Sequence, residues 1–378
     1  MTTGLLEEAW WGASPRLAPR ALGLALAPAG AIFRLGAALR CAAYDHGLAL
    51  AARAAVPVIS VGNVVVGGAG KTPATAAIAE RLKARGRRVA ILSRGYGAVR
   101  SDPRVVSDGE AVLLDAAQGG DEPVLLARRL FGVPVLCGPR RAELARRAVV
   151  ELGADVLLLD DGFQHRSLMR DLDVVLLDAA NPFGNGRCLP AGPNREPRAA
   201  LRRAGLIWLS RVDQVEGPDG ADGAEALERL RALAREASGK GVVESRHAPE
   251  ELLDGTLARP LGLSTLRGQR VLLLSGLARP GSFRRTVEGL GAEIVAERRH
   301  PDHHRFTTAD VEEALGAAER AGCARVVTTE KDALRLPAGI AGDPRLAVLR
   351  IQAEILRGGE LLDAALDAAL ASGRNAGL

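Results

Sequence analysis

The chain has 378 residues, of which 47% are hydrophobic and 25% charged, and its net charge is +5 at neutral pH. These values exclude a disordered or fibrous protein, and the length favours two domains over one. The basic excess favours anionic partners such as nucleotide phosphates or acidic lipids, whereas the low aromatic content (3%) argues against nucleic acid. The four cysteines include no C-x-x-C pair, which indicates reduced thiols and the cytoplasmic side.

An uncharged apolar segment, ALGLALAPAGAIF, occupies residues 21–33 and is bracketed by Arg20 and Arg34. A helix of this length would reach about 20 Å, which is short of the roughly 30 Å hydrocarbon layer of a membrane. Pro28 would also interrupt that helix. We therefore do not expect this segment to span a membrane.

The residues around this segment indicate what it does instead. Glu7 and Glu8 stand where a signal peptide would carry basic residues, which argues against a cleaved leader. Trp10 and Trp11, together with the surrounding arginines, favour an interfacial helix that lies on a membrane. The alternative is a terminal helix packed on the protein's own core. We assign residues 1–52 to a membrane-associating helical segment.

The stretch VGNVVVGGAGKTP, residues 61–73, joins a predicted buried strand over 54–63 to a predicted helix over 72–85. Its glycines let backbone N–H groups turn around an anion, Lys71 can reach the β- and γ-phosphates, and Thr72 can bind Mg²⁺. Val65 stands where the commonest phosphate loop has glycine, so a tight strand-to-helix turn is the alternative. A lysine is nevertheless unusual here, because nearly all the basic residues are arginine. The predicted nucleotide-binding loop comprises Gly67, Gly68, Ala69, Gly70, Lys71 and Thr72.

Strands and helices then alternate up to the charged helix over 223–238. Strands are predicted over 88–93, 133–138, 155–161, 173–179 and 206–213, with helices over 122–130 and 140–152. This order predicts an α/β fold like that of the P-loop NTPases: a mainly parallel sheet with helices on both faces, covering residues 53–240.

The loops that follow these strands carry charged groups that should meet at one edge of the sheet. Asp160 and Asp161, in DVLLLDDGFQH, would sit beside Thr72 and hold Mg²⁺, although adjacent acids at a strand end can also simply form a turn. The other loop residues, each of which alone could be a solvated cap, are Arg94 and Tyr96 in SRGYG, Asp121 and Glu122 in GGDEP, and Arg140 and Arg141 in CGPRRAEL.

A second alternating block predicts a smaller α/β lobe over residues 241–378, with hinge strands and a C-terminal helix. Its strands are predicted over 270–277, 292–297, 324–332 and 346–352, and its helices over 282–290 and 308–321.

Three of the six histidines lie in HPDHHRFT, residues 300–307, next to Asp302. We do not expect zinc there, because no cysteine is near and the H-x-x-x-H helix spacing is absent. A histidine that works in acid–base chemistry with a carboxylate is favoured, with a surface turn as the alternative.

In their order along residues 56–336, these motifs resemble one family, the tetraacyldisaccharide 4′-kinases of lipid A biosynthesis. The motifs are VGNVVVGGAGKTP, SRGYG, GDEP, DDGFQH, LPAGPNREP, PDHHRFT and TTEKDA. The family's loop has the form VGN-x-x-x-GG-x-GKTP, which explains Val65. The resemblance implies that the γ-phosphoryl group of ATP is transferred, with Mg²⁺, to the 4′-hydroxyl of a tetraacylated glucosamine disaccharide 1-phosphate.

The resemblance also implies roles for individual residues. Lys71 and Thr72 would contact phosphates and metal, Asp160 and Asp161 would lie on the magnesium side, and Gln164 and Arg141 would help to hold nucleotide or metal. Asp121 would be the catalytic carboxylate, acting with His303, which requires the lobes to close for turnover. The sequence leaves open whether Arg140 or Arg141, and whether His303 or His304, acts in the site. This sequence departs from the family at Ala69, where threonine is frequent, and at His300, where an aromatic residue is common.

A peripheral location at the cytoplasmic face of the bacterial inner membrane is implied too, with an anionic membrane surface as a partner, and we expect a monomer. The main alternative is a membrane-associated P-loop ATPase or GTPase that acts as a switch. SRVD, residues 210–213, is superficially similar to a guanine-reading loop but lacks Asn-Lys. A purely structural interaction protein would leave the lysine, threonine and paired aspartates without a purpose.

Overall fold

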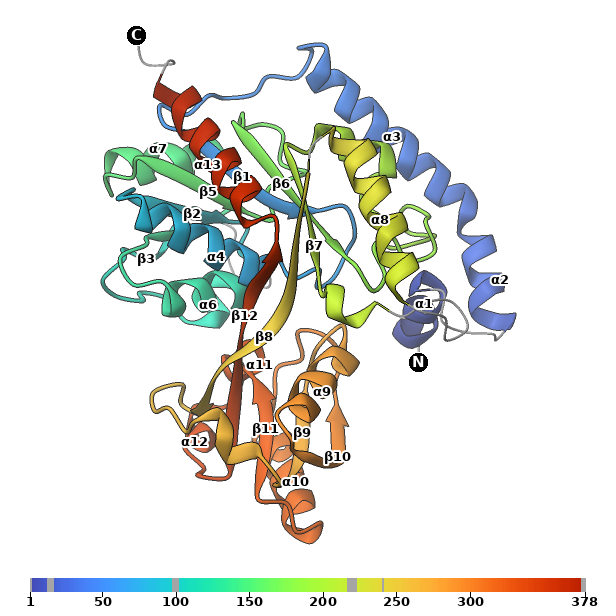
Figure 1. Ribbon diagram of the computed structural model, residues 1–378, viewed down its shortest axis with the longest axis vertical. Coiled ribbons are helices and arrows are strands. Elements are labelled where there is room, and N and C mark those ends of the chain that lie inside the picture. The colour runs from blue at the N-terminus through green and yellow to red at the C-terminus, as the bar shows by residue number, and fades with distance from the viewer. Residues whose placement is uncertain (1, 12–16, 97–101, 216–222, 240, 375–378) are drawn as a thin grey trace. The chain divides into compact units, whose positions relative to one another are not determined.

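The computed structural model describes residues 2–11, 17–96, 102–215, 223–239 and 241–374, and these form two compact units (Figure 1). The first unit comprises Met1–Ser93, Arg140–Arg246 and Ile355–Leu378, and the second comprises Arg94–Pro139 and His247–Glu354. The predicted division was into consecutive ranges. The structure differs because the chain passes between the units repeatedly, so that residues 94–139 group with a segment more than a hundred residues further on.

The first unit is built on a parallel sheet in the strand order β8-β7-β6-β1-β5-β2. Its strands are β1 (Val58–Asn63), β2 (Val89–Ser93), β5 (Val156–Asp160), β6 (Leu172–Asp178), β7 (Leu206–Ser210) and the start of β8 (Val242–Asp254). Each of the first five coincides closely with a predicted strand, because unbroken apolar runs with β-branched residues favour buried strands.

Both faces of this sheet are covered. Val174, Val175, Leu176 and Leu177 are successive residues of β6, and none is more than 1% exposed. Since successive side chains on a strand point to opposite faces, such burial requires packing on each side. The helices that contact the strands are α4 (Lys71–Ala84), α7 (Arg141–Val150), α8 (Gly223–Ser238) and α13 (Gly359–Arg374). This arrangement confirms the predicted fold class.

The C-terminal helix α13 packs on β1 and β6 of the first unit, where Figure 1 shows it in red. Asp363 accepts hydrogen bonds from Arg81 of α4 and from Arg85, just after α4, so charge pairs as well as apolar contacts hold α13 there. The sequence analysis had placed this helix with the second lobe.

Three helices lie at the N-terminus: α1 (Thr2–Trp11), α2 (Leu17–Ala25) and α3 (Ala27–Asp45). Pro28 stands in the first turn of α3, where a backbone N–H has no partner within the helix, so the N–H that proline lacks is not needed. The predicted interruption is therefore a boundary between two helices. No single helix among the described residues meets the length and hydropathy requirements for crossing a membrane. The pair α2 and α3, bent by 48°, meets them only when taken together.

The second unit contains the parallel strands β9 (Arg270–Ser275), β10 (Glu293–Arg299), β11 (Arg325–Thr329) and β12 (Leu346–Arg357), in the order β10-β9-β11-β12 with β8 next to β12. Leu272 and Leu274 of β9 pack with α10 (Thr308–Arg320), whereas Val271 and Leu273 pack with α9 (Pro280–Gly289), so this sheet too is covered on both faces. The unit also holds an antiparallel pair of strands, and the sequence analysis did not predict the first of them. These strands and the remaining helices are β3 (Arg104–Ser107), β4 (Val135–Cys137), α5 (Ala116–Gly119), α6 (Asp121–Arg129), α11 (Glu330–Ala333) and α12 (Ala338–Ala341).

Candidate functional site

The residues predicted to carry chemistry fall into two groups, one in each unit. In the first unit, residues 64–70 form a loop, called the phosphate loop below, that leaves the end of β1 and enters α4 at Lys71. Gly67 (φ 94°) and Gly70 (φ 84°) adopt left-handed backbone conformations, which L side chains rarely take, so glycine is needed at both positions. The main-chain N–H groups at the start of α4 then have the orientation of an anion-binding helix terminus.

The phosphate loop is held in place by the last residue of β7 and the residue that follows it. The Ser210 hydroxyl donates to the carbonyl oxygen of Ala69 at 2.8 Å, and the Arg211 guanidinium donates to the carbonyl of Gly68. Arg211 also forms a buried ion pair with Asp178 at the end of β6. The motif SRVD (210–213), which superficially resembles a guanine-reading loop, therefore supports the phosphate loop.

Lys71 is 8% exposed and lies between two oxygen-bearing partners. Its ammonium group donates to Oδ1 of Asn63 at 3.3 Å and lies 3.6 Å from Oδ1 of Asp161. A buried ammonium so close to the loop supplies the positive charge that a triphosphate requires.

The two aspartates predicted at the end of β5 occupy different environments. Asp160 is fully buried and accepts hydrogen bonds from the hydroxyls of Thr75 and Ser93, both at 3.2 Å. Asp161 accepts from Nη1 of Arg195 at 2.7 and 2.9 Å. Burial alone would raise the pKa of Asp161, but the charges of Lys71 and Arg195 outweigh it and lower that pKa to about 2.

These oxygens fit a magnesium ion. Asp161 is ionised at neutral pH, Asp160 adjoins it, and Thr72 is the second residue of α4. The carboxylate oxygens therefore come from the end of β5, which pairs with β1, and the hydroxyl oxygen comes from the start of α4, where the loop ends. Oxygen donors of this kind are those that Mg²⁺ prefers.

The remaining nucleotide-binding candidates also belong to the first unit. The Gln164 amide donates to the carbonyl of Asn63 at 2.9 Å, and its oxygen accepts from Arg195 at 3.4 Å. Arg141 is the first residue of α7 and is only 2% exposed, whereas the side chain of Arg140 is 69% exposed and pairs with Glu143. This difference in burial separates the two arginines that the sequence left equivalent.

Sequence reasoning missed Arg195 and Arg211. Arg195 lies in LPAGPNREP, a motif that contributed to the family resemblance without a role being given to any of its residues. Its partner Asp161 lies 34 positions away in the chain, so a local sequence pattern does not indicate the contact.

In the second unit, Asp121 and His303 are brought together. The sequence analysis placed them in different lobes, but both belong to this unit, so their contact does not require the lobes to close. Oδ2 of Asp121, the first residue of α6, lies 3.0 Å from Nδ1 of His303, and Nε of Arg335 lies 3.5 Å from the same oxygen. Burial alone would raise the pKa of Asp121, but the hydrogen bond with His303 and the charge of Arg335 outweigh it and bring that pKa below its usual value. Asp121 is therefore ionised at neutral pH, next to a ring that can carry a proton.

His303 is held in an uncommon backbone conformation, with φ 62°, and its N–H donates to Oδ1 of Asp302 at 3.0 Å. The ring of Tyr96, from SRGYG, meets the His303 ring edge-on with centroids 5.6 Å apart. The sequence left open whether His303 or His304 faces the carboxylate, and the structure places His303 there.

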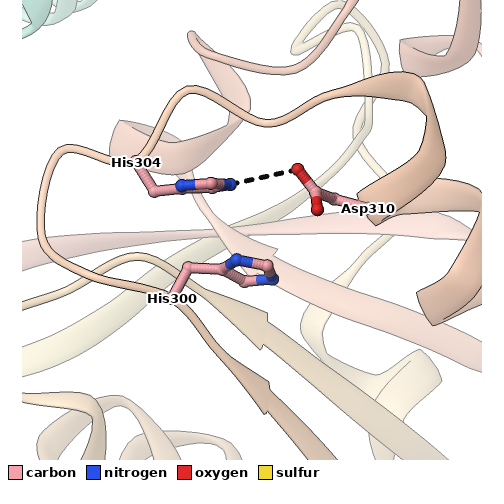
Figure 2. Close-up of side chains that lie close together, drawn as sticks. All are labelled: His300, His304 and Asp310. Carbon is pink, nitrogen blue, oxygen red and sulfur yellow. Dashed lines mark hydrogen bonds and ion pairs between the residues drawn. The ribbon is translucent and has the colours of Figure 1, made fainter. Parts of the chain in front are cut away.

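His304 instead pairs with Asp310, as Figure 2 shows, with Nε2 and Oδ2 3.0 Å apart. His300 stacks on His304 with ring centroids 4.3 Å apart and planes inclined by 22°. These three residues lie close enough to suggest a metal site. However, an ion bound by two imidazoles must lie near both ring planes, and stacked rings do not provide such a position. Asp310 serves as part of the capping box of α10 with Thr307.

Comparison with known proteins assigns the chemistry. A family model described as tetraacyldisaccharide-1-P 4′-kinase matches residues 22–371. A tetraacyldisaccharide 4′-kinase of Anaeromyxobacter sp. (strain Fw109-5) is 65% identical over 98% of this chain and 97% of its own. Another, from Geobacter sulfurreducens, is 38% identical over 97% and 98%.

This chain belongs to the tetraacyldisaccharide-1-P 4′-kinase family. The crystal structure of LpxK from Aquifex aeolicus, which is in complex with ATP, superimposes with a TM-score of 0.72 and 29% identity, covering 92% of this chain and 99% of that one. The protein is therefore a lipid A biosynthesis kinase, a phosphotransferase that acts on an alcohol, and the alternative of a nucleotide-hydrolysing switch is set aside.

Proposed function

We propose that the kinase holds the triphosphate of ATP on the loop 64–72 and uses Asp121, assisted by His303, to take the proton from the 4′-hydroxyl of its acylated glucosamine disaccharide 1-phosphate. The observation that supports these separate roles is the pairing of an ionised Asp121 with Nδ1 of His303 at 3.0 Å. Both residues belong to the second unit, whereas Lys71 belongs to the first.

The donor end of the reaction needs positive charge and alignment more than covalent chemistry. The main-chain N–H groups of the loop and Lys71 supply fixed positive charge to the β- and γ-phosphates. Thr72, Asp160 and Asp161 would hold Mg²⁺, which neutralises phosphate charge when bound. Arg195 donates to Asp161 and also to the amide oxygen of Gln164.

The acceptor end needs a base, because a sugar hydroxyl is a poor nucleophile until its proton is removed. As the hydroxyl oxygen bonds to the γ-phosphorus, the bond between that phosphorus and the β,γ-bridging oxygen breaks and ADP leaves. The hydroxyl proton passes to a carboxylate oxygen of Asp121. His303, which donates through Nδ1, orients that carboxylate and stabilises its charge before transfer.

The experiment that tests the reaction uses ATP labelled in the γ-phosphoryl group together with the disaccharide 1-phosphate. Label in the lipid at the 4′ position is the expected result, and label only in free phosphate would contradict it. Lys71→Met is the matched loss-of-function variant, since it removes the ammonium and leaves a side chain of similar length.

We further infer that the kinase works at an anionic membrane surface, peripherally and on the cytoplasmic side. Large apolar side chains of α2 and α3 support this inference, because Leu24, Ile32, Leu35 and Leu39 are between 60% and 74% exposed. The two helices approach the rest of the unit at small residues: a Cβ on Gly30 would come within 2.8 Å of Cβ of Ala191. An apolar face left uncovered beside arginines is typical of a helix that lies in the interface.

A further inference from the structure

Lys331 lies beside the Asp121–His303 pair and belongs to a motif, TTEKDA, to which the reaction above gives no role. Its ammonium group donates to Oδ1 of Asp302 at 3.2 Å and lies 3.3 Å from Nε2 of His303. The side chain is 21% exposed. Each ring nitrogen of His303 therefore has a charged neighbour: Asp121 at Nδ1 and Lys331 at Nε2.

The chemistry of these neighbours determines where the ring proton lies. Nε2 of His303 also has Oδ2 of Asp302 nearby, but at 3.8 Å that oxygen lies beyond hydrogen-bond distance. The nearer Lys331 ammonium can only donate a hydrogen bond, so Nε2 offers it a lone pair. The proton of the neutral ring is then on Nδ1, and this N–H donates a hydrogen bond to the carboxylate of Asp121. If Nε2 carried the proton instead, Lys331 would face an N–H group and Asp121 would face a lone pair.

Lysine suits this position better than arginine. The chain has lysine only at positions 71, 83, 240 and 331, and every other basic side chain is an arginine. A compact ammonium can direct separate donors at the Asp302 oxygen and the His303 nitrogen, whereas the guanidinium fork is planar and matches a single carboxylate.

The backbone that carries Lys331 is anchored by its neighbour. Asp332 is fully buried and accepts from the hydroxyl of Thr329 at 2.8 Å, from the N–H of Gly276 at 3.2 Å and from Arg335 at 2.7 Å. Arg335 in turn approaches Asp121. Asp332 of α11 thus anchors both cations that flank the pair: Lys331 as its neighbour in the helix, and Arg335, just after the helix, through a hydrogen bond.

We propose that Lys331 is a positioning residue that holds His303 in the tautomer with its proton on Nδ1, so that His303 donates to Asp121 during phosphoryl transfer. This inference rests on the proposed roles of Asp121 and His303. The inference extends the hydrogen-bonded pair of Asp121 and His303 to a chain of four residues: Asp121, His303, Lys331 and Asp302.

The test combines nitrogen NMR with kinetics on the full-length kinase. In protein labelled with ¹⁵N-histidine, the His303 signals are assigned by their loss in His303→Ala. The wild type should show a protonated Nδ1 and an unprotonated Nε2. Lys331→Met should give a mixture of tautomers and lower kcat about tenfold or more while leaving KM for ATP nearly unchanged.

Two further variants separate this role from a general loss of charge or fold. Lys331→Arg keeps a cationic donor and should retain the wild-type tautomer and a larger share of kcat. Lys83→Met removes a surface lysine that pairs with Glu80 and should change neither measurement.

The inference is overturned if wild-type His303 carries its proton on Nε2, or if Lys331→Met keeps the wild-type spectrum or the wild-type kcat. Its failure is distinct from that of the proposed function. If Asp121→Asn and His303→Ala retain full kcat, the proposed proton transfer is wrong, and the NMR comparison still decides whether Lys331 sets the tautomer.

Discussion

The charge on Asp161 is set by two cations that come from different parts of the first unit, Lys71 and Arg195. Because its pKa is lowered to about 2, the carboxylate contributes to folding stability above the pKa of an unfolded aspartate, about 3.9, and loses that contribution as the pH falls toward 2. Asp161 thus stays ionised throughout the range in which a kinase of this kind would work.

We predict that Asp161→Asn lowers the free energy of unfolding by roughly 2 kcal/mol at neutral pH, and that this difference shrinks below about pH 4. Urea unfolding of both proteins at a series of pH values measures it. A difference that grows as the pH falls would show that the carboxylate is not held in its ionised form.

The Asp121–His303 pair is the residue-scale feature on which the proposed proton transfer depends. We predict that Asp121→Ala or His303→Ala lowers kcat by about 10²-fold or more, with less effect on KM for ATP, because neither residue belongs to the phosphate loop. Steady-state kinetics with both substrates varied provide the measurement. His300→Phe, which alters a neighbouring histidine that does not contact Asp121, is the control and should keep most of the activity.

At the scale of elements, the phosphate loop depends on β6 and β7 as much as on its own glycines. The buried ion pair of Arg211 and Asp178 joins the ends of these two strands, and Arg211 also holds the carbonyl of Gly68. Removing one partner of such a pair leaves a buried charge uncompensated, which typically costs about 3–5 kcal/mol.

We therefore predict that Arg211→Met lowers stability by several kcal/mol and raises KM for ATP. The double variant Arg211→Met with Asp178→Asn should recover much of the stability while KM stays high, because the loop remains unsupported. Thermal unfolding and ATP kinetics distinguish the two effects. Arg202→Met, at an exposed neighbouring position, should behave as wild type. A wild-type KM in the double variant would refute the role of Arg211 in holding the loop.

At the scale of the whole molecule, the proposed membrane attachment combines the net charge of +5 with the exposed faces of α2 and α3. In this proposal, apolar side chains would supply affinity for the acyl region, and arginines would supply attraction to anionic headgroups, which salt screens.

We predict that the kinase co-sediments with phosphatidylglycerol vesicles, and that molar salt weakens this binding. Replacing Ile32, Leu35 and Leu39 by glutamine should lower vesicle affinity about tenfold or more, because each substitution removes exposed apolar surface that would be buried in the membrane. Val150→Gln, which changes an exposed apolar residue of α7, is the matched control. Equal binding by the triple variant and the wild type would contradict the membrane proposal.

Local patterns predicted most of the elements and the phosphate loop. Apolar runs mark the strands β1, β5 and β6, Pro28 marks a helix boundary, and Gly67 and Gly70 mark the turns that only glycine makes readily. Each of these features depends on residues close together in the chain, so the sequence displays it directly.

What the sequence by itself determined is thus the nucleotide loop, the α/β alternation and, through the order of its motifs, the family. Only the tertiary structure decided that His303 rather than His304 meets Asp121, a residue 182 positions earlier, and that Arg141 rather than Arg140 is buried. It also decided that Arg195 and Lys331 complete the two charge networks. The physical reason is that a side chain's neighbours across the fold depend on how strands and helices pack, which no spacing along the chain encodes.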